Sequence, residues 1–194
     1  MPDAGRVVTG SAGGLRLEAP GPGTRPFSDK VKQALFSMLE AEDEHIWDHP
    51  ALDLFAGSGA AGIEALSRGA PAAVLVEKDR RAVETIRRNL EWTHLADAGR
   101  VVRADVLGFL DAPPPEAPFG AIVLDPPYAQ AADLLAVMQR LAADAAAWLT
   151  DGGQVAAKHF WKDAPADAIG SLERLRQRRF GETALSVYRR GVRQ

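Results

Sequence analysis

The sequence predicts an α/β fold of Rossmann-like type, in which a mainly parallel sheet carries helices on both faces. Short apolar runs alternate with segments of helical periodicity, which is the pattern of a parallel sheet flanked by helices. A glycine-rich turn follows the first central run, and two strand-like segments close the chain around a turn. A length of 194 residues suits one domain with a sizeable core.

The central part of the chain is typical of a βαβ series. We expect strands at residues 51–55, 72–77, 100–104, 120–124 and 153–157, and helices at residues 59–68, 79–94, 106–111 and 131–149. Near the C-terminus, RLRQRRF and ALSVYRR flank the turn-like GET. The sheet should therefore end in an antiparallel strand pair.

The N-terminal residues predict a small hairpin that precedes the main sheet, because RVVTG and LRLEA flank SAGG. A helix should follow, capped by Ser28, with one apolar face formed by Val31, Leu35, Met38 and Leu39. We therefore expect an N-terminal extension over residues 1–45 and a main domain over residues 46–194.

Composition excludes several classes of protein. The chain is 46% hydrophobic and 25% charged, which is the balance of a folded globular protein. It contains no cysteine, so disulfides, thiolate nucleophiles and cysteine zinc sites are excluded. None of its four histidines shows a metal-binding spacing, and we expect no metal. No signal-like or membrane-spanning apolar run is present, which favours the cytoplasm.

The net charge of −3 hides a segregation along the chain. Residues 1–32 hold five basic groups against three acids, residues 173–194 hold seven against two, and the middle holds 11 against 21. Basic ends on an acidic body can surround one site with positive potential, although a merely solvated surface explains the count about equally well.

The glycine-rich turn is the first motif that carries chemistry. In DLFAGSGAAG, Gly57 and Gly59 permit a tight turn and a close ligand approach, and the following helix offers free amide groups. Glu77 ends the next strand 20 residues after Gly57, where a carboxylate can accept hydrogen bonds from ribose hydroxyls. A structural turn with a solvated Glu77 is the less favoured alternative.

Two aspartates bear on the choice of ligand. An acid at Asp53, four positions before the first glycine, is unfavourable to the pyrophosphate of a dinucleotide. S-adenosylmethionine carries a sulfonium and an ammonium, which an acid attracts, while helix capping is the structural alternative for Asp53. Asp105 can accept from an adenine amine or cap the helix that follows it, and both roles can hold together.

The decisive motif is Asp125-Pro126-Pro127-Tyr128, which follows the apolar strand AIVL. A base amine is a weak nucleophile, and hydrogen-bond acceptors can orient its lone pair. The Asp125 carboxylate and the Pro126 carbonyl can each accept an amine hydrogen, while Tyr128 offers a stacking face to a base that has left its stack. An ordinary proline turn is the structural alternative.

With these motifs the chain resembles the bacterial RsmD family of 16S ribosomal-RNA guanine-N2 methyltransferases. The resemblance covers nearly the whole chain and is carried by RVVTGSAGGLRL, TRPFSDKVKQALFSML, LDLFAGSGAAGIEALSRGA with VEKD, and LDPPY with FGETALSVYRR. TRP-x-x-D-x-V before an amphipathic helix is the most family-specific of these. Phe27 and Lys158-His159 depart from the usual residues of such proteins.

The resemblance implies the class I S-adenosylmethionine-dependent methyltransferase fold and methyl transfer to the exocyclic N2 amine of a guanine in small-subunit ribosomal RNA. The implied cofactor contacts are Asp53, Phe55, Ala56, Gly57, Ser58, Gly59, Glu77, Lys78, Asp105 and Val106. The implied catalytic residues are Asp125, Pro126, Pro127 and Tyr128. The N-terminal extension should contact RNA through Arg6, Arg16, Arg25, Lys30 and Lys32.

Two other functions compete with this one. A DNA adenine-N6 methyltransferase would share the glycine loop and DPPY but usually needs a substantial target-recognition region, for which the chain has no room. A noncatalytic or NAD-binding protein of the same fold is disfavoured by Asp53 and by DPPY. The expected partner is ribosomal RNA, free or within the small ribosomal subunit, and we expect a monomer.

Overall fold

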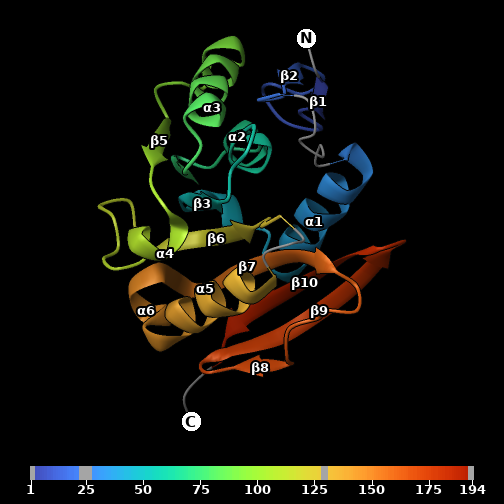
Figure 1. Cartoon of the computed structure of the whole chain (residues 1–194), viewed down its shortest axis with the longest axis vertical. Helices are drawn as coiled ribbons and strands as arrows, with labels where there is room; N and C mark the ends of the chain where they lie inside the picture. The colour runs from blue at the N-terminus through green and yellow to red at the C-terminus, as the bar shows by residue number, and fades with distance from the viewer. Residues whose placement is uncertain (1–2, 22–27, 128–130, 192–194) are drawn as a thin grey trace.

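A computed structural model describes residues 3–21, 28–127 and 131–191 and shows an eight-stranded sheet with helices on both sides (Figure 1). The strand order is β5-β4-β3-β6-β7-β10-β9-β8. The parallel strands are β3 (Ala51–Leu54), β4 (Ala73–Glu77), β5 (Gly99–Arg103), β6 (Phe119–Leu124) and β7 (Leu149–Phe160). The expected parallel series is confirmed, and its order reverses between β3 and β6, where α/β sheets bind ligands.

The C-terminal part of the sheet is antiparallel. Strand β10 (Thr183–Arg190) lies between β7 and β9 (Leu172–Phe180) and pairs antiparallel with both, while the short β8 (Ala168–Ile169) pairs with β9. The turn between β9 and β10 contains Gly181, whose φ of 62° suits glycine. The antiparallel pair predicted around GET is therefore confirmed.

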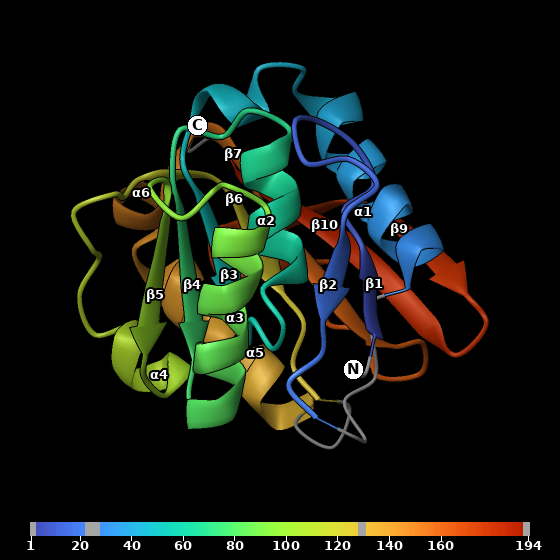
Figure 2. The same cartoon turned by 90° about the horizontal axis from the view of Figure 1, so that it is seen from above.

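Helices cover both faces of the sheet, and the sheet separates two cores (Figure 2). One core joins α1 (Asp29–Glu42), α2 (Ala60–Ser67) and α3 (Arg80–Trp92) to strand residues such as Leu75 and Val123. The other joins α4 (Val106–Phe109), α5 (Ala131–Ala143) and α6 (Ala145–Trp148) to their neighbours Val74 and Ile122. Alternate strand residues face opposite cores, which explains why the central strands are apolar apart from Asp53 in β3 and Glu77 at the end of β4. Among the described helices, none combines the length and apolarity that a membrane span needs.

The structure corrects the expected boundaries around β7. The helix expected at residues 131–149 is two helices, separated at Asp144, and β7 starts at Leu149 rather than at residue 153. The strand passes through Gly152 and Gly153 with an irregular register against β6. Gly152 has a φ of 82°, and a Cβ on Gly153 would lie 2.8 Å from the Phe119 carbonyl oxygen, so glycine permits the irregularity.

The N-terminal hairpin forms a separate two-stranded sheet of β1 (Asp3–Arg6) and β2 (Arg16–Glu18). Its first strand ends at Arg6, before most of the RVVTG segment expected to form it, and Val7 N–H instead donates to the Leu15 carbonyl at 2.9 Å. Ala4, Val7 and Leu17 are buried in the same core as α1 and α2. The hairpin is therefore packed onto the sheet domain.

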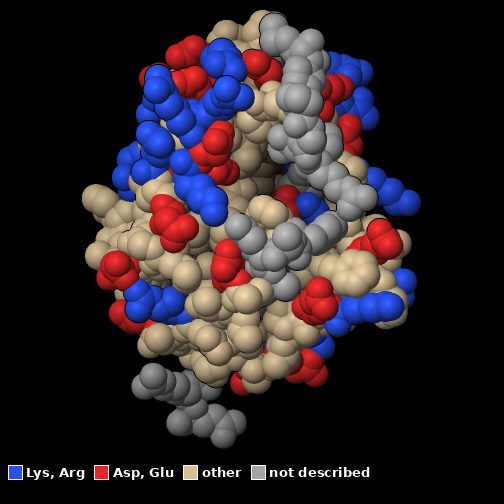
Figure 3. Space-filling model, viewed as in Figure 1, with Lys and Arg blue, Asp and Glu red and all other residues tan. Residues whose placement is uncertain are grey.

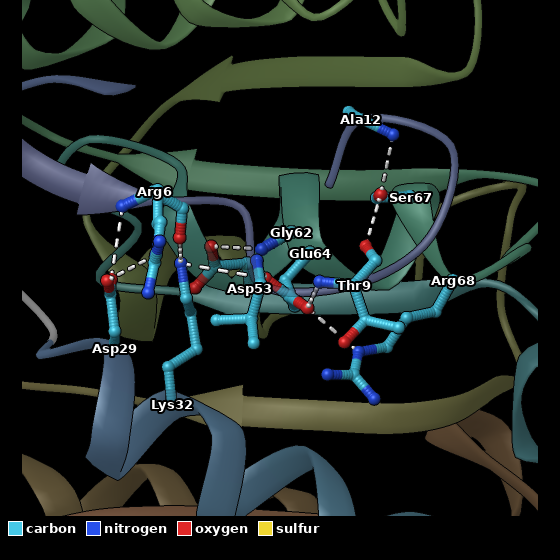
Figure 4. Close-up of polar contacts among 11 residues, drawn as sticks. Arg6, Thr9, Ala12, Asp29, Lys32, Asp53, Gly62, Glu64, Ser67 and Arg68 are labelled. Atoms are coloured by element: carbon cyan, nitrogen blue, oxygen red, sulfur yellow. Dashed lines mark hydrogen bonds and ion pairs between the residues drawn. The ribbon is translucent and has the colours of Figure 1, made fainter. Parts of the chain in front are cut away.

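A buried carboxylate holds this hairpin in place (Figure 4). Glu64 of α2 has no exposed side-chain surface and accepts backbone hydrogen bonds from Val8 at 2.7 Å and Thr9 at 3.1 Å. Arg68 Nε donates to Glu64 at 2.9 Å, and Lys32 Nζ of α1 lies 3.6 Å from it. Two cations and two amides from three segments therefore converge on one carboxylate.

The contacts continue outward from Glu64. Lys32 Nζ donates to the Arg6 carbonyl at 2.5 Å, and Arg68 Nη1 donates to Glu40 of α1 at 2.7 Å. Ser67 Oγ donates to the Thr9 carbonyl at 2.6 Å. Burial lowers the pKa of the Lys32 ammonium, and the Glu64 carboxylate opposes that shift. These contacts join the hairpin, α1 and α2 into one polar cluster.

Replacing Glu64 should therefore destabilise the protein strongly. Glu64→Gln leaves the Lys32 and Arg68 cations buried without their shared counter-charge, and we expect a loss of about 3–5 kcal/mol in the free energy of unfolding. Glu84→Gln is the matched control, because Glu84 pairs with Arg80 on the exposed face of α3 and should lose less than about 1 kcal/mol. Urea unfolding of both variants measures the difference, and equal losses would contradict the role assigned to Glu64.

Candidate active site

The turn between β3 and α2 has the backbone geometry of a ligand-binding loop. Phe55, Gly57 and Gly59 have φ values of 65°, 56° and 80°. Positive φ is costly for a phenylalanine, and such strain persists where the surroundings enforce it. A Cβ on Gly57 would meet only the Phe55 carbonyl oxygen, at 3.9 Å, so space is open above this residue. A Cβ on Gly59 would press on Leu75 and Ile86 at 3.1 Å, so this glycine allows the close packing of the loop.

Asp53 lies beneath the loop and is only 2% exposed. Its Oδ2 accepts a hydrogen bond from Gly62 N–H of α2 at 2.8 Å, so the helix contact weighed from the sequence is present. Burial raises the pKa of Asp53 to about 7; the Gly62 hydrogen bond opposes this, and the charges of Asp125 and Glu77 add to it. A cationic ligand placed between these three carboxylates would relieve their repulsion.

Glu77 supports the glycine loop from the end of β4. Its Oε2 accepts from Gly57 N–H at 2.9 Å, and its Oε1 accepts from Asp79 N–H at 2.9 Å. Each carboxylate oxygen has two lone pairs, so both can accept a further hydrogen bond from a ligand hydroxyl. The carboxylate thus fixes the loop while remaining available, and its predicted contact with ribose stays a prediction.

The remaining predicted cofactor residues lie around the same edge of the sheet. Asp105 is exposed and caps α4, accepting from Leu107 N–H at 3.0 Å, while Val106 beside it is buried. Ala56 is buried with its N–H bonded to β4, Ser58 is partly buried, and Lys78 is exposed after β4. The cap at Asp105 leaves its exposed carboxylate able to accept a second hydrogen bond.

Asn89 of α3 links the glycine loop to the hairpin. No sequence motif pointed to this residue. Its side chain is 2% exposed. The Nδ2 group donates to the carbonyls of Ser58 and Glu18, both at 2.9 Å, and Oδ1 accepts from Glu18 N–H at 2.9 Å. One amide therefore contacts the glycine loop and β2 together.

The DPPY aspartate meets a lysine from the adjacent strand. Lys158 Nζ of β7 donates to Asp125 Oδ1 at 2.5 Å, with only 13% of the lysine and 21% of the aspartate side chain exposed. Burial raises the pKa of Asp125, and the Lys158 charge and hydrogen bond oppose that shift. Pro126 is buried and Pro127 is exposed, whereas Tyr128 lies outside the described residues.

The register of two neighbouring strands places Lys158 beside Asp125. Leu124 pairs with Ala157 in the parallel β6–β7 ladder, which places the next residues, Asp125 and Lys158, side by side. His159 points elsewhere, with Nε2 2.9 Å from Ser186 Oγ. The sequence marks Lys158 as unusual, but only the register shows what it contacts.

The residues predicted to bind RNA differ in their exposure to solvent. Arg6 and Lys30 are exposed, as is Arg16, although Arg6 pairs with Asp29 at 3.0 Å and Arg16 pairs with Asp3. Lys32 is a correction, because its buried ammonium faces Glu64 and cannot reach a phosphate. Arg25 lies outside the described residues.

A separate groove borders this hairpin and has a volume of about 480 Å³. It runs between β2 and α3, and its lining consists of Asp3, Arg16, Leu17, Glu18, Arg88, Asn89 and Trp92. Arg88 pairs there with Glu18 at 2.9 Å, and Arg16 pairs with Asp3. The positive charge of the groove is therefore balanced within it.

A basic surface that the charge count did not reveal covers α3 and β5. Figure 3 shows Lys and Arg side chains gathered over these elements on a face that is hollowed near its centre. The exposed basic residues of α3, β5 and the loop before α3 are Lys78, Arg80, Arg81, Arg87, Arg88, Arg100 and Arg103. Arg80, Arg88 and Arg100 pair with Glu84, Glu18 and Glu116. Lys78, Arg81, Arg87 and Arg103 form no ion pair among the described residues and give this surface its excess positive charge.

Known proteins resemble the chain over most of its length. The family described as Conserved hypothetical protein 95 matches residues 5–189. The candidate rRNA methyltransferase YlbH of Bacillus subtilis is 35% identical over 187 residues, which cover 95% of this chain and 98% of YlbH. Ribosomal RNA small subunit methyltransferase D of Escherichia coli is 39% identical over 124 residues, covering 63% of this chain and 60% of that protein.

Solved structures agree with the fold described above. The candidate methyltransferase YhhF of Escherichia coli has a TM-score of 0.82 at 30% identity, covering 96% of this chain and 97% of YhhF. A hypothetical protein of Thermus thermophilus has a TM-score of 0.75 at 34% identity, covering 94% of this chain and 97% of that one. The class I methyltransferase fold that the sequence predicts is thereby confirmed.

The buried Asp53 should make stability depend on pH. Its pKa is about 7 in the folded protein against an ordinary value of 3.8, so the folded state retains a proton that the unfolded state releases. Stability therefore falls as pH rises from about 4 to 7, and the loss is complete above 7. Asp53→Asn keeps an acceptor for Gly62 N–H and removes the charge. At pH 8 it should raise the free energy of unfolding by on the order of a few kcal/mol.

Urea unfolding at pH 8 and at pH 4.5 measures this effect. The advantage of Asp53→Asn should shrink at the lower pH, where the native aspartate is already protonated. Asp97→Asn, at an exposed position, is the control and should change little at either pH. An advantage of equal size at both pH values would show that ionisation of Asp53 is not its cause.

Proposed function

The chain belongs to the Conserved hypothetical protein 95 family, and from that premise and the site geometry we propose that it is an S-adenosylmethionine-dependent ribosomal-RNA methyltransferase. We propose further that it acts on the exocyclic N2 amine of a guanine in small-subunit ribosomal RNA. The observation that carries the proposal is the placement of the DPPY aspartate beside a strained glycine loop ringed by carboxylates.

The residues of the loop fit S-adenosylmethionine. The open space above Gly57 admits a ligand close to the backbone. Asp53 and Glu77 favour the positive sulfonium and ammonium groups, whereas the pyrophosphate of NAD would be repelled by them. Asp105 is available to an adenine amine. The cofactor supplies an electrophilic methyl group on its sulfonium when bound.

At the target base, residues of the chain orient the reacting amine. Lys158 occupies Asp125 Oδ1, so Oδ2 and the Pro126 carbonyl are left to accept the two amine hydrogens. These acceptors aim the lone pair of the amine at the methyl carbon and stabilise the positive charge that the nitrogen gains as the bond forms. The proton leaves afterwards, to water or to Asp125, because a cationic secondary arylamine is a strong acid.

The relatives support RNA over the competing substrates. The match to YlbH, which is named as an rRNA methyltransferase, spans nearly both chains. A noncatalytic nucleotide-binding role leaves the buried Asp125–Lys158 pair unexplained. We propose that the N-terminal extension contacts RNA through exposed residues such as Arg6 and Lys30. We propose also that the protein acts as a monomer in the cytoplasm, on free RNA or on the small subunit.

Cofactor binding gives the first test of this proposal. Calorimetry should show micromolar-range binding of S-adenosylmethionine and none of NAD. Glu77→Ala removes charge-assisted hydrogen bonds and the support of Gly57, so affinity should fall at least about tenfold. Glu91→Ala, at an exposed position of α3, should leave affinity unchanged. Tight NAD binding, or an unaffected Glu77→Ala, would overturn the assignment.

The catalytic role of Asp125 gives the second test. In single-turnover methylation of small ribosomal subunits, Asp125→Ala should slow transfer by about a hundredfold or more, with cofactor affinity nearly unchanged. Asp125→Asn keeps an acceptor without the charge and should retain more activity than the alanine variant. Digestion of the RNA to nucleosides should yield N2-methylguanosine.

A paired variant separates chemistry from folding. Asp125→Ala leaves the largely buried Lys158 without its carboxylate, which can itself destabilise the protein. Adding Lys158→Met should restore stability without restoring the rate. Wild-type rates in Asp125→Ala would show that DPPY is a structural turn, and recovery of activity by Lys158→Met would show that the charge imbalance caused the defect.

A further inference from the structure

An aromatic and basic cluster lies at the turn between β9 and β10, outside the site described so far. We call it the β9–β10 tip, and it consists of Phe160, Trp161, Lys162, Arg178, Arg179 and Phe180. The Arg179 guanidinium lies 3.7 Å from the centroid of the Trp161 ring, and Lys162 Nζ lies 5.4 Å from it. Arg178 lies 5.1 Å from the Phe180 ring. The tip thus alternates flat apolar rings with cations.

The cations of the tip differ from three other arginines of the same hairpin. Arg174, Arg176 and Arg190 each pair with a carboxylate, namely Asp167, Glu42 and Asp151. Lys162, Arg178 and Arg179 are exposed, and among the described residues none of them forms an ion pair. The nearby acids Asp163 and Glu182 leave a local excess of positive charge.

Backbone contacts hold the tip in a defined shape. Trp161 N–H donates to the Glu182 carbonyl at 3.0 Å, and Arg179 Nε donates to the Gly181 carbonyl at 2.7 Å. Phe160 pairs with Thr183 in the β7–β10 ladder, so the aromatic pair sits on the end of the sheet. A preformed surface of this kind loses little conformational freedom when it binds.

The tip lies at the same edge of the sheet as Asp125. Trp161 comes three residues after Lys158, which contacts Asp125, so it lies about 10 Å further along the direction of β7. Figure 1 shows the end of β9 reaching beyond the central strands. An RNA strand whose guanine lies at Asp125 would extend along this direction to reach the tip.

We propose that the β9–β10 tip binds an unpaired nucleotide that flanks the target guanine. Its base stacks on the Trp161–Arg179 pair, and Arg178 and Lys162 contact the adjoining phosphates. Stacking on aromatic rings or guanidinium planes together with phosphate contacts is how proteins hold single-stranded RNA. This inference rests on the proposed function, because it takes the base at Asp125 to be part of an RNA strand.

The test compares tip variants with matched controls in binding to a short oligouridine RNA that carries one guanine. Trp161→Ala should raise the RNA dissociation constant by about five- to a hundredfold. Trp92→Ala, which removes a 61% exposed tryptophan from α3, should not. Arg178→Gln/Lys162→Gln should lower the logarithmic salt slope by about 1.4, whereas Arg189→Gln/Arg190→Gln at the opposite end of β10 should leave it unchanged.

Three further readouts separate this inference from the proposed function. The tip variants should have the cofactor affinity and the single-turnover rate at saturating RNA of the wild type, because the tip contributes only to RNA binding. If the wild type methylates ribosomal RNA and the tip variants bind RNA as tightly as it does, the inference fails while the proposed function stands. If the tip variants lose activity only on assembled subunits and bind free RNA normally, the tip contacts a ribosomal protein and the inference also fails.

Discussion

The buried carboxylate of Glu64 is the interaction on which the rest of the structure depends. A charge removed from water is tolerated only when it is paired and fully hydrogen-bonded, and Glu64 meets this condition by drawing on three separate segments. The placement of the hairpin, the rotation of α1 and the position of α2 are thereby fixed together. Because α2 begins at the glycine loop, the same cluster anchors the side of the site that faces the cofactor.

Local patterns in the sequence are sufficient to predict most of the sheet, the glycine loop and DPPY, because these depend on residues close together in the chain. Contacts across the fold are not predictable in this way. The sequence predicted that Lys30 and Lys32 both contact RNA. Residues two apart lie on nearly opposite sides of a helix, however, and Lys32 faces inward. Lys158 and Asp125 are 33 residues apart in the chain, and their contact requires the register of two strands.

Charge counted along the chain is a poor guide to charge on the surface. The C-terminal segment is strongly basic, yet three of its arginines pair with acids contributed by other parts of the chain. The acidic middle presents basic residues of α3 and β5 on one face, and Arg80, Arg88 and Arg100 among them also pair with acids. Folding redistributes charge because it brings distant acids next to particular bases, and the field that an RNA meets is set by the bases left over.

The side-chain amide of Asn89 connects the glycine loop to the N-terminal hairpin through hydrogen bonds. It shares its hydrogen bonds between the carbonyl of Ser58 in the glycine loop and the backbone of Glu18 in the hairpin. Any ligand that shifts one of these partners alters the hydrogen bonds available to the other. Thermodynamic linkage then requires reciprocity: if the hairpin binds RNA as proposed, the factor by which cofactor binding changes the RNA affinity equals the factor by which RNA changes the cofactor affinity. The Asn89 amide can therefore couple the two sites energetically without any moving domain.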